Sequence, residues 1–103
     1  MREFPRGTTQ DAKPYIALIR SFTEGQITAQ QFEERYLRLS KSEEKLLPKA
    51  VSKPINEVFY SVDEYVSDPD LRARAGGIDD DQLKEDAAAA LAALVSAVEN
   101  QDD

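Results

Sequence analysis

The chain of 103 residues has no cysteine, no histidine and only four glycines. Without cysteine or histidine it can form no disulfide, no thiolate or imidazole metal site, and no Ser-His or Cys-His catalytic pair. No apolar run approaches the ~20 residues that span a membrane, and the N-terminus lacks the apolar stretch of a signal peptide. These absences argue against an enzyme and favour a cytoplasmic protein that uses no cofactor.

Charge is abundant and unevenly distributed along the chain. Residues 1–54 hold ten Lys/Arg and seven Asp/Glu, a balance of +3, whereas residues 55–103 hold three Lys/Arg and thirteen Asp/Glu, a balance of −10. A negative field of this kind repels nucleic acid and membrane surfaces and attracts basic proteins. Many soluble proteins are acidic for solubility alone, so the charge by itself leaves both interpretations open.

Two helices are predicted in the first half of the chain, where large apolar side chains recur at helical spacing. The first is expected to start between Asp11 and Pro14 and to end at Gly25. The second has the clearest start signal, because Thr28 is placed as its N-cap and Gln31 stands three residues further on, as a capping box requires.

A third helix is predicted to begin near Pro54, after a stretch in which Pro48 argues against one continuous helix. Its buried side is expected to consist of apolar residues at helical spacing: Ile55, Val58, Phe59, Val62 and Val66. Asp68 and Pro69 should end this helix and open a loop.

A fourth helix should follow that loop, with Asp79 as its N-cap and Gln82 three residues on in a second capping pattern. No strand pattern is present. The sequence therefore predicts one all-α domain over residues 1–103, an antiparallel four-helix bundle, with loose tails at residues 1–10 and 100–103.

An acidic belt is the main candidate for a binding site. Its carboxylates are expected on the outer face of the third helix, in the loop after it and at the entry to the fourth helix: Glu57, Asp63, Glu64, Asp68, Asp70, Asp79, Asp80 and Asp81. Such a patch would resemble a row of phosphates, and a protein with a basic nucleic-acid groove would be steered onto it. The alternative is a solvated helix face joined to ordinary helix-start carboxylates.

Other polar residues allow further interpretations. Tyr60 and Tyr65 flank the apolar side of the third helix, and Tyr60 joins the candidate site because tyrosine beside carboxylates is favoured at interfaces; half-buried core edges are the alternative. The three consecutive aspartates of the fourth helix offer oxygen ligands, but the spacing of a calcium loop is missing. Glu57 and Glu64 are two turns apart, with no sign that burial would activate either one. We therefore expect no metal ion and no catalytic residue.

Three segments together resemble a known family. Residues 19–39 read IRSFTEGQITAQQFEERYLRL, residues 57–72 read EVFYSVDEYVSDPDLR, and residues 76–94 read GGIDDDQLKEDAAAALAAL. Their order and spacing resemble the colicin D immunity proteins, a family that includes immunity proteins for contact-dependent inhibition toxins. The likeness covers roughly residues 14 to 98, and the chain departs from it in its alanine-rich last helix and acidic tail.

The resemblance implies a four-helix bundle that binds the C-terminal nuclease domain of a secreted toxin. In the family's namesake the toxin cleaves tRNA, and the immunity protein offers negative charge to the basic tRNA-binding cleft. Carried over, Glu57, Asp63, Glu64, Asp68 and Asp70 would mimic phosphates, and the three aspartates of the fourth helix would extend the patch or merely cap the helix. The alternative function is a helical regulatory adaptor that binds a basic protein without catalysis.

Overall fold

The computed structural model describes residues 6–100, and this part of the chain is all-helical. Its elements are η1 (Thr9–Ala12), α1 (Lys13–Thr23), α2 (Ala29–Ser42), α3 (Lys49–Glu64), α4 (Pro69–Ala75) and α5 (Asp80–Glu99). Two isolated β-bridges are present, but no strand forms within the described residues. The all-α prediction is confirmed, and α4 is a short helix in the segment that was predicted to be a loop.

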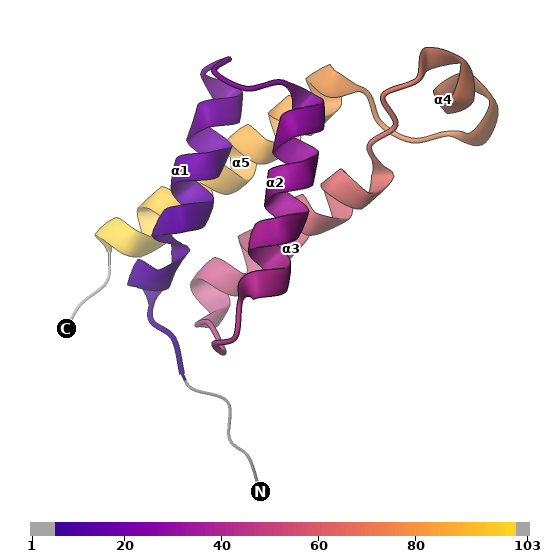
Figure 1. The fold of residues 1–103 in the computed structure, drawn as a ribbon. Coiled ribbons are helices and arrows are strands. Elements are labelled where there is room, and N and C mark those ends of the chain that lie inside the picture. Colours follow the sequence, from indigo (N-terminus) through magenta and orange to yellow (C-terminus); the bar gives the residue numbers. More distant parts are fainter. Residues whose placement is uncertain (1–5, 101–103) are drawn as a thin grey trace, which may run out of the picture.

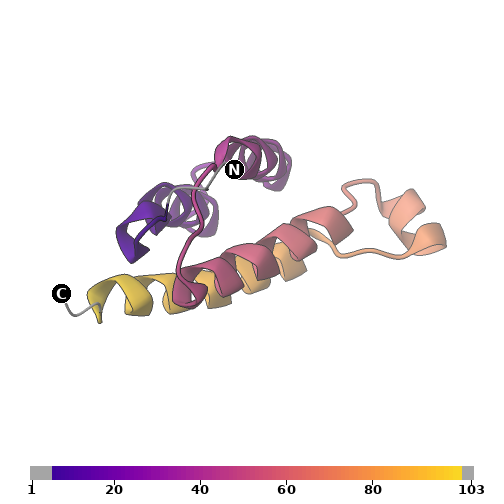
Figure 2. The ribbon, with the colours of Figure 1, turned by 90° about the horizontal axis from the view of Figure 1, so that it is seen from below.

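The four long helices form two antiparallel pairs. Helix α1 pairs with α2, and α3 pairs with α5, which makes the most extensive helix contact in the molecule (Figure 1). Figure 2 shows that the α1–α2 pair lies across one face of the α3–α5 pair and leaves the other face uncovered. The helices are therefore arranged in two crossed layers, rather than side by side along one bundle axis.

The core between the layers combines aliphatic side chains from all four long helices with four aromatic side chains of α1 and α2. Phe22 and Phe32 stack with their ring centroids 4.5 Å apart, and Tyr15 meets Tyr36 edge-on at 5.7 Å. The Tyr36 hydroxyl donates a 2.6 Å hydrogen bond to the carbonyl of Ile55 in α3. This bond joins α2 in the first layer to α3 in the second, and it satisfies a hydroxyl that would be unfavourable to bury without a partner.

Both predicted N-caps are present. In α2 the Gln31 backbone N–H donates to the Thr28 hydroxyl at 3.1 Å, and the Thr28 N–H donates to the Gln31 side chain at 2.9 Å, which confirms the capping box. In α5 the Gln82 N–H donates to the Asp79 carboxylate at 2.9 Å. The Gln82 side chain does not return to its cap, however, because it donates to Asp86 one turn later.

Helix α3 starts at Lys49, so the predicted start near Pro54 is wrong. Pro48 does separate α2 from α3, as its N-cap residue, while Pro54 lies inside α3 and is buried. A proline there removes one backbone hydrogen bond. The extra turn nevertheless forms, since it places Val51 in the core with no exposed surface.

The predicted buried side of α3 is only partly correct. Ile55, Val58 and Val62 are buried, but the Phe59 side chain is 38% exposed. Phe59 lies at the edge of the apolar stripe, beside the turn between α2 and α3. Val66 follows the end of the helix and is partly exposed.

Helix α3 ends at Glu64, so the prediction that Asp68 and Pro69 end it is wrong. The chain becomes extended at Tyr65, where its backbone bonds with Ile78 begin, and Asp68 and Pro69 instead begin α4. The Asp68 carboxylate accepts hydrogen bonds from the N–H groups of Asp70 at 2.9 Å and Leu71 at 3.4 Å, as an N-cap does. Pro69 occupies the first turn of α4, where its missing N–H is harmless. The seven-residue α4 contributes no buried residue to the core.

A backbone clip returns the chain from α4 to the end of α3. The Val66 N–H donates to the Ile78 carbonyl at 3.1 Å, and the Ile78 N–H donates to the Glu64 carbonyl at 2.9 Å. Gly77 makes this approach possible, because an added Cβ would lie 2.6 Å from the Val66 side chain and 2.8 Å from the Glu64 carbonyl oxygen. The clip brings the start of α5 beside the end of α3.

Part of the segment expected to be an N-terminal tail is anchored. The Gly7 N–H donates to the Leu46 carbonyl at 2.9 Å, and the Thr8 N–H donates to the Asp11 carboxylate at 2.7 Å. Lys45 pairs with the same carboxylate at 3.0 Å. The outermost residues of the two expected tails, 1–5 and 101–103, lie outside the described residues.

Candidate functional site

Seven of the eight candidate carboxylates gather where α3 ends, α4 turns and α5 begins, at the right of Figure 1. We call these residues the acidic end: Asp63, Glu64, Asp68, Asp70, Asp79, Asp80 and Asp81. All seven are exposed to solvent. The eighth carboxylate, Glu57, is also exposed but lies two turns earlier on α3. The clip at Val66 and Ile78 therefore brings together most of the belt that the sequence predicted.

The acidic end is not neutralised by direct ion pairs. Within residues 6–100 the ion pairs are Arg38–Glu34 at 3.2 Å and Lys45–Asp11 at 3.0 Å, and neither involves a candidate residue. The two arginines of α4 donate instead to backbone carbonyls, Arg72 to Val66 at 2.6 Å and Arg74 to Asp70 at 3.4 Å. Negative charge thus dominates this end of the molecule.

Arg72 of α4 lies beside the start of α5. It shares a shallow hollow of about 350 Å³ with Ser67, Pro69 and the aspartates 79–81. No bond of 4 Å or less joins its guanidinium to any carboxylate of the described chain. Arg72 consequently reduces the local negative potential without removing the charge of a particular aspartate.

Three carboxylates of the acidic end also stabilise the fold. Asp68 caps α4 and Asp79 caps α5, as described above. Asp80 accepts a 2.6 Å hydrogen bond from the Tyr65 hydroxyl. Tyr65 is buried at 7% exposure, so of the two tyrosines only Tyr60 is open to solvent, at 66%.

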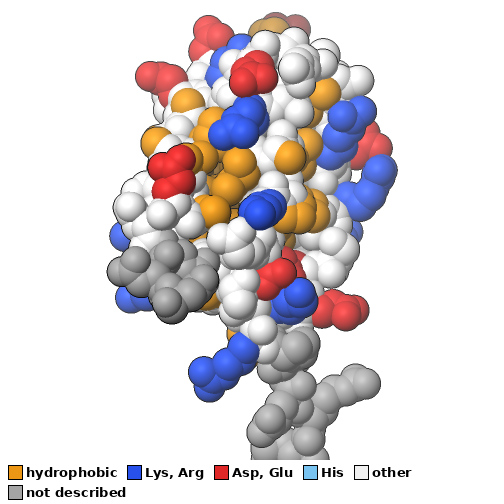
Figure 3. Space-filling view, turned by 90° about the vertical axis from the view of Figure 1, so that its left-hand side faces the viewer, with side chains coloured by type: hydrophobic (Ala, Val, Ile, Leu, Met, Phe, Trp, Pro, Cys, Tyr) orange, Lys and Arg blue, Asp and Glu red, His pale blue; other side chains and the backbone are white. Residues whose placement is uncertain are grey.

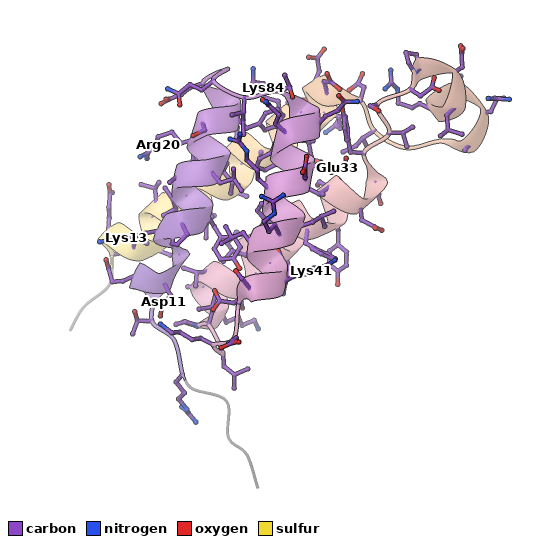
Figure 4. All side chains as sticks on the ribbon, viewed as in Figure 1. Asp11, Lys13, Arg20, Glu33, Lys41 and Lys84 are labelled. Atoms are coloured by element: carbon purple, nitrogen blue, oxygen red, sulfur yellow. The ribbon has the colours of Figure 1, made fainter. Side chains whose placement is uncertain are left out.

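Glu33 of α2 is an acidic neighbour of this site that is not among the candidate residues. It is half-buried and projects toward the side where α3 ends (Figure 4). Burial raises the pKa of Glu33. The pKa of Tyr65 is also raised, first by burial, then by its bond to Asp80 and by the charges of Asp80 and Glu33. Nothing in the spacing of α2 shows that Glu33 would meet α3.

Asp86 is a second acidic residue that is not among the candidates predicted from the sequence. It is half-buried on α5, where its carboxylate accepts hydrogen bonds from the Ser61 hydroxyl at 2.8 Å and the Gln82 side chain at 2.9 Å. The i, i+4 spacing of Gln82 and Asp86 is visible in the sequence. The bond from Ser61 depends on which flank of α5 packs against α3, and that is fixed only by the tertiary structure.

Glu57 and Tyr60 lie on a groove of about 510 Å³ between α3 and α5. We call it the α3–α5 groove, and its lining residues are Pro54, Glu57, Tyr60, Ser61, Asp86, Ala89, Ala90 and Ala93. The groove has an alanine floor and two carboxylates at its sides. The candidate residues thus divide between this groove and the acidic end.

The face opposite the acidic end carries side chains of both charges. Figure 3 shows the face at the left of Figure 1, where basic and acidic side chains are scattered around a central hydrophobic area. Lys84, the one basic residue of α5, places its ammonium 5.9 Å from the centre of the Phe22 ring in α1 (Figure 4). It therefore leaves the acidic end and the α3–α5 groove without a lysine from α5.

Two other kinds of site are not found in the described part of the chain. Among residues 6–100 no three carboxylates are grouped as ligands of one metal ion would be. None of the helices in the same range has both the length and the apolar character needed to cross a membrane.

The fold and the surface define an all-helical protein with a concentrated, unpaired negative charge at one end. The family described as "Bacterial self-protective colicin-like immunity" matches residues 12–94, and the chain belongs to this family. The resemblance to colicin immunity proteins is thereby confirmed at the level of this family. Neither the curated proteins nor the solved structures give a significant match. Family membership assigns the chain to toxin-neutralising immunity, in which proteins generally act by binding a toxin rather than by catalysis.

Proposed function

We propose that this chain is a cytoplasmic immunity protein that binds the C-terminal nuclease domain of its cognate toxin and occludes the basic active-site cleft. The toxin of this proposal cleaves RNA, with tRNA as the expected substrate, and the acidic end takes the place of the phosphate backbone. The observation that carries the proposal is that all eight candidate carboxylates are exposed and none is ion-paired.

The electrostatic argument concerns both association and release. The unpaired carboxylates create a negative potential that accelerates the approach of a basic protein. At contact, charge pairs shielded from water and the exposed ring of Tyr60 would slow dissociation. Because the net charge of the whole chain is −7, free RNA is repelled, and the nuclease is the partner that this surface attracts.

Co-purification with the product of the neighbouring toxin gene is the first test. An immunity gene should lie beside a toxin gene, and its deletion alone should be lethal, whereas a regulatory adaptor would show neither property. Purified chain should then inhibit RNA cleavage by the toxin's nuclease domain at a 1:1 ratio. A chain that binds the domain but leaves RNA cleavage unchanged would contradict the occlusion mechanism.

Charge reversal tests which surface is used. The double variant Asp63→Lys and Glu64→Lys changes two exposed residues whose side chains form no ion pair with any residue from 6 to 100, and it should slow association strongly. The matched control, Glu24→Lys with Glu44→Lys, changes the net charge equally on exposed positions elsewhere. Equal losses in both variants would show that net charge alone matters, and that the acidic end is not the contact surface.

The ionic strength of the solution provides an independent measurement. Raising the salt concentration from ~50 to ~500 mM should lower the association rate constant at least ~10-fold, because the Debye length shortens to a few ångströms. The control variant should keep this dependence, and the acidic-end variant should lose most of it. An association rate that does not change with salt would rule out charge mimicry as the basis of recognition.

A further inference from the structure

We propose that the α3–α5 groove receives one arginine side chain of the bound toxin, held between the carboxylates of Asp86 and Glu57 and against the ring of Tyr60. This inference rests on the proposed function, since it identifies the chemistry by which the same partner is anchored. It concerns the uncovered face of the α3–α5 layer, seen in Figure 2, rather than the acidic end.

Asp86 is the first reason for this proposal. Its two carboxylate oxygens are held by Ser61 at 2.8 Å and Gln82 at 2.9 Å, so the group is oriented before any partner arrives. It is half-buried, yet no lysine or arginine of the described chain lies within ion-pair distance. Each oxygen can accept a second hydrogen bond. A half-buried carboxylate that is fixed but not charge-compensated is suited to an incoming cation.

The other walls of the groove favour a cation with a long apolar stem. The alanines 89, 90 and 93 give a smooth apolar floor, along which the methylene groups of lysine or arginine can lie. Glu57 adds a second negative charge at the side, and no basic residue lines the groove. The groove is therefore complementary in charge to a basic partner and has room for one extended side chain.

Tyr60 is the reason for choosing arginine over lysine. Its side chain is 66% exposed and lines the same groove as Asp86. A guanidinium group is planar, stacks on aromatic faces and can donate to carboxylates in parallel, whereas a lysine ammonium is a compact, strongly hydrated charge. The combination of an aromatic wall with a pre-oriented carboxylate matches the guanidinium better.

Nuclear magnetic resonance with capped amino acids tests the site on the intact chain without the toxin. The probes are N-acetyl-arginine amide, N-acetyl-lysine amide and the neutral isostere N-acetyl-citrulline amide. The arginine probe should shift the backbone resonances of Ser61, Asp86, Ala89 and Ala93, with a dissociation constant on the order of millimolar. The lysine probe should bind at least about threefold more weakly, and citrulline should cause no shift at these positions.

Two variants and one control locate the binding. Asp86→Asn should weaken arginine binding at least about fivefold, since a charge-assisted hydrogen bond is lost. Ala89→Leu with Ala93→Leu should abolish it by filling the groove. Ala88→Leu with Ala92→Leu is the matched control, because both positions are exposed on α5 and neither lines the groove. Circular dichroism should show unchanged helix content in all of these variants.

Several results would overturn the inference. They are the absence of chemical-shift changes at the groove residues, equal shift changes with the arginine and citrulline probes, equal affinity for the arginine and lysine probes, or equal loss of arginine binding in the control variant.

The groove variants also separate this inference from the proposed function. If they still inhibit the toxin fully while the probe fails to bind, the groove proposal falls and the immunity function stands. If the probe binds in the groove but the wild-type chain does not inhibit the nuclease, the immunity mechanism falls instead.

Discussion

Replacing Asp79 separates the structural role of an acidic-end carboxylate from its proposed role in toxin binding. The Asp79 side chain accepts the hydrogen bond from the Gln82 N–H at 2.9 Å and begins the longest helix of the chain. Asp79→Ala removes both the cap and the charge. Asp79→Ser also removes the charge, but serine is as good an N-cap as aspartate.

The expected magnitudes differ between these two variants. Loss of an N-cap costs about 1 kcal/mol, which for a domain of this size lowers the melting temperature by about 4 °C. Asp79→Ser keeps the cap and loses only the interaction of the charge with the helix dipole, about 0.3–1 kcal/mol for an exposed residue, which Asp79→Ala loses as well. Reduced repulsion from Asp80 and Asp81 offsets part of that loss.

Thermal unfolding followed by circular dichroism measures the first effect, and association with the toxin domain measures the second. Asp79→Ala should melt several degrees below Asp79→Ser, whereas both variants should associate with the toxin equally slowly. The reasoning is refuted if the serine variant is destabilised as much as the alanine variant, since the Asp79 side chain would then not act through its cap hydrogen bond.

Two further substitutions and a change of pH test the contacts that stabilise the fold. Tyr65→Phe removes the 2.6 Å bond to Asp80 and should lower the free energy of unfolding by about 1 kcal/mol in urea denaturation, with an unchanged m-value. Leu83→Ala truncates a side chain with no exposed surface and should cost about 2–5 kcal/mol in the same assay. Burial raises the pKa of Tyr15 to about 12 and also raises the pKa of Tyr36, from the ordinary 10.0. The folded state therefore keeps protons that the unfolded state releases, so the free energy of unfolding should fall as pH rises above about 10.

Local signals in the sequence predicted the parts of the fold that depend on neighbouring residues. The capping box of α2 and the N-cap of α5 were recognisable because each is complete within four residues. The start of α3 was not, since Pro54 argues against a helix locally and only the burial of Val51 against the other helices outweighs it. Helix α4 was missed because Asp68 and Pro69 were expected only to break a helix, whereas they are the N-cap and the first residue of a new one.

In the candidate site, too, the sequence predicted what depends on neighbouring residues and missed what depends on tertiary contacts. Charge along the chain identified the carboxylates of the acidic end, but the clip that gathers them uses backbone groups of Val66 and Ile78, which composition does not reveal. Phe59 was assigned to the core and is partly exposed. Asp86 was overlooked because its importance comes from Ser61, a residue 25 positions away in the sequence.

The acidic end raises the question of how a small domain tolerates seven neighbouring carboxylates. Mutual repulsion among them destabilises the compact state. Hydrogen bonds made by three of these carboxylates offset part of that repulsion. Asp68 and Asp79 cap the N-termini of α4 and α5, and Asp80 accepts a hydrogen bond from the Tyr65 hydroxyl. The others, on α3, α4 and the first turn of α5, make no side-chain hydrogen bond or ion pair within the described chain.

Asp70 and Asp81 lie in the first turns of α4 and α5, where the helix dipole favours a carboxylate. Asp63 and Glu64 lie in the last turn of α3, where the dipole disfavours them, so folding gives no reason for these two charges. Relief of their repulsion by the proposed basic partner would account for them, and that relief would contribute to the affinity.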